Sequence, residues 1–107
     1  MIAILSAAAV FACNLKALTA QERIHHTENS RQLRAAVVET QERPAGLRFR
    51  LNGPALTTIA DWVQLERRCC PFFTFVIELE GDGGPTWLTL SGAPGVKEFI
   101  RLELDLH

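Results

Sequence analysis

Two adjacent cysteines, Cys69 and Cys70, are the residues of this chain whose type and spacing most directly offer chemistry. They lie at the centre of the segment RRCCPFF, which runs from Arg67 to Phe73. Neighbouring thiols can bind one soft ion, close into a strained vicinal disulfide, or be buried as small apolar side chains. The chain has three cysteines, so at least one of them is unpaired within the chain.

The third cysteine, Cys13, extends the metal-binding interpretation. If the segment around it packs beside Cys69 and Cys70, three thiolates meet, a set that suits Hg(II), As(III) or Cu(I), or Zn(II) with a fourth ligand. His25 and His26 are the candidates for that fourth ligand. The polar helix on which they are expected equally fits two solvated histidines. No C-x-x-C or H-x-x-x-H spacing is present, so only the fold can bring these groups together.

The electrostatic setting of the cysteine pair favours metal binding over nucleophilic catalysis. The pair is expected where a helix ends, and the partial negative charge of a helix C-terminus disfavours a thiolate. Arg67 and Arg68 supply two cations there, which either offset this field or cap the last carbonyls. A metal ion can drive deprotonation of a thiol in such a place, whereas catalytic cysteines favour helix N-termini or cationic surroundings.

Composition and charge bound the class of protein. The chain has 107 residues, of which 48% are hydrophobic and 21% charged, and this predicts one globular domain. We expect residues 1–11 to be an apolar lead-in and residues 12–107 to form that domain. The formal charge of −1 gives no support for nucleic-acid binding, and no organic cofactor is indicated.

The apolar start of the chain leaves two interpretations of its location. The run from Ile2 to Cys13 is too short to span a bilayer, and no basic residue precedes it, as a secretory signal requires. We therefore expect a cytoplasmic protein without a membrane span. The alternative is a bacterial lipoprotein, because Val10-Phe11-Ala12-Cys13 loosely resembles a lipoprotein cleavage site.

Periodicity predicts the elements that must position these thiols. A capping box at Thr19 and Glu22 predicts a helix over residues 20–36, with Ile24, Leu33 and Val37 on its buried side. A second helix is expected over residues 55–69, ended by the proline that follows Cys70. Its apolar face is expected to comprise Leu56, Ile59, Val63 and Cys70, widened by Trp62 and Leu65.

Alternating apolar residues predict two hairpins and a short last helix. The first hairpin pairs residues 37–41 with 47–51, and the second pairs 73–79 with 87–90. A short helix is expected from Val96, followed by Leu102, Leu104 and Leu106 as a final strand or a dimer edge. The order helix, hairpin, helix, hairpin, helix predicts an α+β fold, with a three- or four-stranded antiparallel sheet and helices mainly on one face.

Several segments together resemble a known family. These are ERRCCPF from Glu66, GPTWL from Gly84, GVKEF from Gly95 and, before them, CNL at residues 13–15 with ALT and ER shortly after. They are similar to a small uncharacterised bacterial family with a Cys-Cys-Pro-Phe motif, over about residues 12–100. The resemblance implies a joint role for Cys13, Cys69 and Cys70 and an association with heavy-metal resistance. The family places an aromatic residue near Leu47, a difference that affects packing only.

Three functional hypotheses follow from these residues. The leading one is a thiol protein that binds a soft metal or metalloid ion for sequestration, delivery or sensing, with the ion or a thiol-bearing protein as partner. The second is an enzyme that uses Cys69 and Cys70 in thiol redox or transfer chemistry. The third is a protein-interaction domain whose cysteines are structural.

Overall fold

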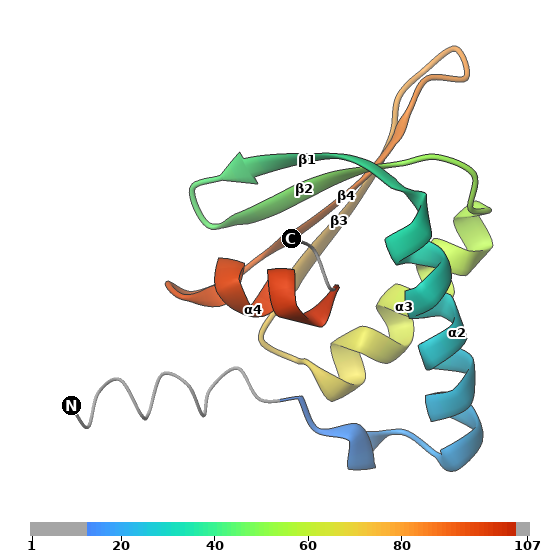
Figure 1. Ribbon diagram of the computed structural model, residues 1–107, viewed down its shortest axis with the longest axis vertical. Coiled ribbons are helices and arrows are strands. Elements are labelled where there is room, and N and C mark those ends of the chain that lie inside the picture. The colour runs from blue at the N-terminus through green and yellow to red at the C-terminus, as the bar shows by residue number, and fades with distance from the viewer. Residues whose placement is uncertain (1–12, 105–107) are drawn as a thin grey trace.

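The structure is a computed structural model that describes residues 13–104 (Figure 1). The expected lead-in at residues 1–11 and Leu106 lie outside the described residues. The elements follow in this order: the 3₁₀-helix η1 (Leu15–Ala17), α2 (Ala20–Ala36), β1 (Val37–Arg43), β2 (Gly46–Leu51), α3 (Leu56–Cys69), β3 (Thr74–Leu79), β4 (Thr86–Ser91) and α4 (Val96–Glu103).

The sheet confirms the α+β class. Its four strands are antiparallel throughout and lie in the order β1-β2-β4-β3, so the two hairpins join through their second strands. At this central pairing Gly46 lies opposite Ser91, and the β2 and β4 backbones approach there too closely to leave room for a side chain. The resulting sheet is continuous across both hairpins, with β2 and β4 at its centre.

The two faces of the sheet differ in chemistry. Leu47, Phe49 and Leu90 are fully buried on the face that packs against the helices. Figure 1 shows the three α-helices of the described chain gathered on that side. On the opposite face the Arg48 guanidinium lies 3.7 Å from the centre of the Trp87 ring and also pairs with Glu78. The side chains of the sheet thus follow the period of two that strands impose.

Helix α2 begins where its capping box predicts, but it buries a partly different face. The Thr19 hydroxyl accepts from the Glu22 N–H, and the Glu22 carboxylate accepts from the Thr19 N–H. Ile24, expected to be buried, is 72% exposed. Leu33 is buried as predicted, together with His26, Asn29 and Ala36. Two of these four residues are polar, and one of them, His26, pairs with Glu66 of α3.

The inward face of α3 also differs from the expected apolar stripe. Ile59 and Trp62 are fully buried as predicted, whereas Leu56 is 46% exposed. Glu66 and Cys69 complete the buried side of the helix. These positions follow one another at intervals of three or four residues, so they form one continuous stripe that faces α2.

The C-terminal part of the described chain is helical. Leu102 lies in the last turn of α4 and is 76% exposed, whereas Leu104 directly follows the helix and is buried. Neither residue belongs to a final strand. Between residues 13 and 104, no helix combines the length and apolar character needed to cross a membrane.

Candidate functional site

Cys13 and Cys70 meet in a disulfide at the C-terminal end of α3. The N-terminal segment is held there by its backbone, since the Asn14 N–H donates to the Cys69 carbonyl over 2.7 Å. A second tie comes from the Arg68 guanidinium, which donates to the Ala17 carbonyl at 2.8 Å. These contacts bring a residue distant in sequence against the vicinal cysteine pair.

Cys69 is the one free thiol among the chain's three cysteines. It is 1% exposed, and its Sγ lies 3.8 Å from the Cys70 Sγ. The thiol also contacts the backbone carbonyl of Glu66 at 3.6 Å and the Glu66 Oε1 at 3.8 Å. Burial, followed by the negative charges of Glu66 and Glu103, raises the pKa of Cys69 to about 12. The thiol is therefore protonated at neutral pH.

Glu66 is a carboxylate with no exposed surface, one helical turn before Cys69. Its Oε1 pairs with the Nε2 of His26 at 2.7 Å, across the interface between α2 and α3. The His26 ring also stacks on Trp62 with 5.8 Å between ring centres, and the Trp62 indole N–H donates to the Ser30 hydroxyl. His26 is thus held in one orientation by an aromatic plane and a buried acid.

Two polar atoms of this pair have no hydrogen-bond partner among the described residues. They are the Nδ1 of His26 and the Oε2 of Glu66. A buried carboxylate is costly unless it is paired with a cation, bound to a metal or neutralised by a proton. A neighbouring carboxyl group also offers an oxygen atom within 4.8 Å of a Glu66 oxygen.

That neighbouring carboxyl belongs to Glu103, at the end of α4. Its Oε2 lies 3.9 Å from the Cys13 Sγ. Burial, followed by the negative charge of Glu66, raises the pKa of Glu103 to about 8, although the positive charge of Arg34 partly opposes this. The raised pKa favours the protonated form of Glu103 at neutral pH.

Together these groups form what we call the thiol corner, defined as Cys13, Cys69, Cys70, His26, Glu66 and Glu103. Potential ligand atoms gather in it as two sets, and within each set all atoms lie no more than 4.8 Å apart. One set comprises Cys13, Cys70, Glu66 and Glu103, and the other His26, Glu66 and Cys69. Glu66 belongs to both sets and links them.

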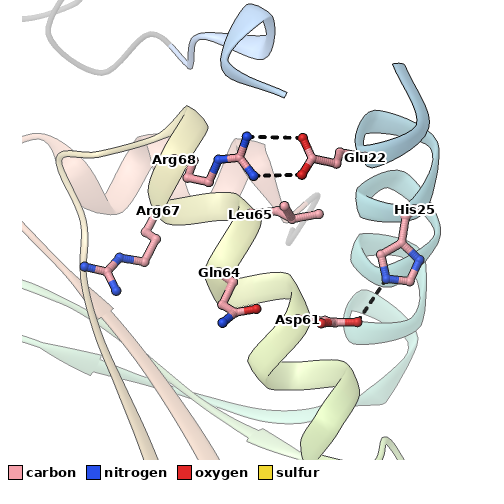
Figure 2. A pocket seen from close by; sticks show the side chains of 7 residues that line it. All are labelled: Glu22, His25, Asp61, Gln64, Leu65, Arg67 and Arg68. Carbon is pink, nitrogen blue, oxygen red and sulfur yellow. Dashed lines mark hydrogen bonds and ion pairs between the residues drawn. The ribbon is translucent and has the colours of Figure 1, made fainter. Parts of the chain in front are cut away.

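His25 is not part of the thiol corner. Its Nε2 pairs with an Asp61 carboxylate oxygen at 3.0 Å on the surface between α2 and α3. Figure 2 shows this pair in a groove of about 730 Å³, in which the Arg68 guanidinium also faces the Glu22 carboxylate. Arg67 points away from that ion pair. Of the two histidines proposed as ligands, only His26 lies with the sulfur atoms.

The sequence interpretation omitted the two carboxylates of the thiol corner. A usable signal existed for Glu66, because it lies on the same stripe as Ile59, Trp62 and Cys69. No local signal existed for Glu103, which enters the corner through the packing of α4. Comparison of the chain with protein-family models, with curated proteins and with solved structures finds no match. Any function assigned to the thiol corner therefore rests on its own residues.

Proposed function

We propose that the reduced form of this protein binds a thiophilic metal or metalloid ion through Cys13, Cys69 and Cys70. The observation that carries the proposal is that the Cys70 sulfur lies beside both other sulfur atoms, bonded to that of Cys13 and 3.8 Å from that of Cys69. The sequence separates Cys13 from Cys70 by 57 residues, and the fold closes that separation. The resemblance to a family associated with heavy-metal resistance is compatible with this role.

The spacing of the sulfur atoms fits a shared ion. Two thiolates bound tetrahedrally at about 2.3 Å are separated by about 3.8 Å. The Sγ atoms of Cys69 and Cys70 are 3.8 Å apart. Once the disulfide is reduced, the Cys13 sulfur must separate from that of Cys70 to take the third position of a trigonal set. Two of the three sulfur atoms thus already have the spacing that a shared ion requires.

Charge balance favours As(III) among the ions Hg(II), As(III), Cu(I) and Zn(II). Arsenous acid reacts with three thiols to give a tris-thiolate and three waters, so the thiol protons leave as water. The product is neutral, which suits a buried site already holding two carboxyl groups. This route also fits thiols that are protonated at neutral pH, such as Cys69. The three-sulfur complexes of Hg(II), Cu(I) and Zn(II) each carry net negative charge in the same surroundings.

The disulfide must be opened before three thiols are available. A dithiol protein or two small thiols reduce it, so that Cys13 and Cys70 each gain a proton and the reductant forms its own disulfide. Cys13 is the half-buried partner and Cys70 the fully buried one, so the attacking thiolate reaches the Cys13 Sγ first. A reducing cytoplasm, the location that we propose, keeps such a pair open.

The test is a titration of the reduced protein with arsenite, followed by native mass spectrometry, with Hg(II), Cu(I) and Zn(II) in parallel. We expect one As(III) per chain, with the mass of a tris-thiolate. Cys69→Ser, Cys70→Ser and Cys13→Ser should each abolish that species, and the disulfide-bonded protein should not form it. Arsenite binding that survives Cys69→Ser with Cys70→Ser would refute the proposal. Absence of binding to a folded, reduced protein would favour structural cysteines instead.

A thiol redox enzyme is the second candidate, favoured by the disulfide with a free thiol beside it. Attack of Cys69 on the Cys70 sulfur would form a vicinal disulfide and release the Cys13 thiol. The raised pKa of Cys69 opposes this step, because only the thiolate attacks. The absence of turnover with small disulfide substrates would separate this candidate from ion binding. Sequestration, delivery and sensing all remain compatible with the first proposal.

A further inference from the structure

We propose that the disulfide-bonded form of the protein binds a borderline divalent cation, of which Zn(II) is the type, at His26, Glu66 and Cys69. This site is distinct in ligands and oxidation state from the three-sulfur site, although both use Cys69 and lie in the thiol corner. The inference extends the proposed function to the oxidised protein, in which Cys13 and Cys70 are bonded to each other and give up no thiolate.

The geometry of the three groups is that of a compact ligand set. The His26 Nε2 lies 2.7 Å from the Glu66 Oε1, and the Cys69 Sγ lies 3.8 Å from the same oxygen. All three ligand atoms fall within 4.8 Å of one another, and all three residues are buried. Ligands at 2.0 to 2.3 Å from one zinc ion are separated by about 3 to 4 Å, so small rotations suffice to admit the ion.

The fixed placement of the three ligands supports a site rather than a chance cluster. Helix α3 presents Glu66 and Cys69 one turn apart on the same stripe. The stacking of His26 on Trp62, and the hydrogen bond from Trp62 to Ser30, hold the imidazole against that stripe. Rigid elements and locked rotamers are what a metal site requires of its surroundings.

The unpartnered Glu66 Oε2 is an independent observation that points to a cation. Glu66 is wholly buried, and among the described residues neither a lysine nor an arginine forms an ion pair with it. A divalent ion bound to the Glu66 carboxylate, a Cys69 thiolate and a neutral imidazole forms a site with no net charge. Such neutrality removes the cost of the buried carboxylate. The fourth position of a tetrahedral ion is open to Glu66 Oε2 or to water.

The proton balance of binding is simple. The imidazole binds the ion through an Nε2 that carries no proton, and the Cys69 thiol releases one proton to solvent. No electron transfer takes place, and the Cys13–Cys70 bond stays intact. One nitrogen, one oxygen and one sulfur ligand make a borderline set that suits Zn(II) and Co(II), whereas three sulfur ligands suit softer ions. The oxidation state of the disulfide thus selects the class of ion.

The experiment is a titration of the oxidised full-length protein with Co(II), read by absorption spectroscopy. Co(II) bound to a thiolate gives a charge-transfer band, and Cys69 is the only thiol available in this form. We expect one Co(II) per chain, the charge-transfer band, visible bands typical of four-coordinate Co(II), and displacement by Zn(II). A protein that folds but shows no such band at millimolar Co(II) would overturn the inference without any variant being needed.

The chain provides matched controls for the ligand assignment. His26→Ala should weaken Co(II) binding by about tenfold or more, whereas His25→Ala, one residue away and paired with Asp61, should leave it unchanged. Cys69→Ser should abolish the charge-transfer band, and Glu66→Gln should weaken binding. Circular dichroism of each variant checks its fold. Equal loss in both histidine variants would contradict the assignment.

The two proposals fail separately. Co(II) binding by the oxidised protein without arsenite binding by the reduced protein would leave only the site at His26, Glu66 and Cys69. Arsenite binding without the Co(II) band would leave only the three-sulfur site. The oxidation state of the parent protein distinguishes them further, because As(III) binding requires reduction, whereas the three ligands proposed for Co(II) are present with the Cys13–Cys70 bond intact.

Discussion

Reduction of the Cys13–Cys70 disulfide should destabilise the domain by an amount that its loop size sets. The bond joins residues that are 57 positions apart. The chain-entropy relation for a loop of this size gives about 4 kcal/mol at 25 °C. The free energy of unfolding of a small domain is about 5 to 15 kcal/mol, so this one bond accounts for a large part of the stability. A loss of that size lowers Tm by about 15 °C or more.

Denaturant unfolding with and without a phosphine reductant measures this loss. Cys69→Ser is the matched control, because it removes a cysteine outside the disulfide and should keep the sensitivity to reductant. Cys13→Ser should behave like the reduced protein under both conditions. If the reductant leaves the unfolding midpoint of the parent protein unchanged, then Cys13 and Cys70 are not bonded in solution and the reasoning fails.

The same assay connects stability to ion binding. A ligand that binds only the folded state at about a thousandfold excess over its Kd adds about 4 kcal/mol of stability. Saturating arsenite should therefore restore roughly what reduction removes. Restoration should be absent in Cys13→Ser, which lacks one of the three sulfurs. An equal rise in that variant would show that arsenite stabilises the protein elsewhere.

Three further predictions concern the thiol, the sheet and a surface ion pair. At pH 8, a thiol with a pKa of about 12 is ionised about a thousandfold less than a thiol with a pKa of 9. Cys69 of the oxidised protein should therefore react with iodoacetamide at least a thousandfold more slowly than a free thiol. Reaction at the rate of a free thiol would contradict the burial of Cys69. Gly46→Ala should destabilise the protein by about 3 kcal/mol or more in denaturant unfolding, because the added Cβ would collide with the Leu90 carbonyl oxygen; unchanged stability would mean that β2 and β4 lie farther apart. The hydrogen bond from Arg68 lowers the pKa of Glu22 from 4.5 to about 2, so its contribution to stability is present above pH 4.5 and is lost as pH falls towards 2. Parent and Glu22→Gln melting curves should therefore differ at pH 7 and converge near pH 2, and a constant difference would exclude this linkage.

Local sequence signals placed the elements that carry the thiol corner. The capping box at Thr19 and Glu22 fixed the start of α2, because two reciprocal hydrogen bonds there depend only on near neighbours. The strict alternation around Phe49 identified a central strand, because one face of that strand is buried and the other meets solvent. Both signals act over a few residues, and the structure bears them out.

The inward face of α2 was predicted only in part, because two of its four buried residues, His26 and Asn29, are polar. An apolar stripe through Ile24 was expected, yet Ile24 is exposed and His26 is buried. Periodicity locates a buried face by the hydrophobic residues on it, so a face lined by histidine and asparagine gives no signal. The Cys13–Cys70 bond was equally invisible, because its two residues are brought together only by the tertiary fold.

These failures share a physical cause that bears on function. His26 is buried because Glu66 of α3 faces it, and Glu66 is buried because His26 pairs with it, so neither helix alone explains its own polar face. Such a pair costs stability relative to apolar packing. The Cys13–Cys70 disulfide, one helical turn from Glu66, contributes about 4 kcal/mol to the free energy of unfolding and offsets that cost in the oxidised protein. Residues that contradict the local sequence pattern, such as buried polar side chains, concentrate at functional sites, because function requires groups that stability alone would not retain. The buried polar residues that the sequence pattern did not predict are therefore the same residues that bring ligand atoms together. Replacement of Glu66 tests this link most directly, because Glu66 is both a buried polar residue and a proposed ligand.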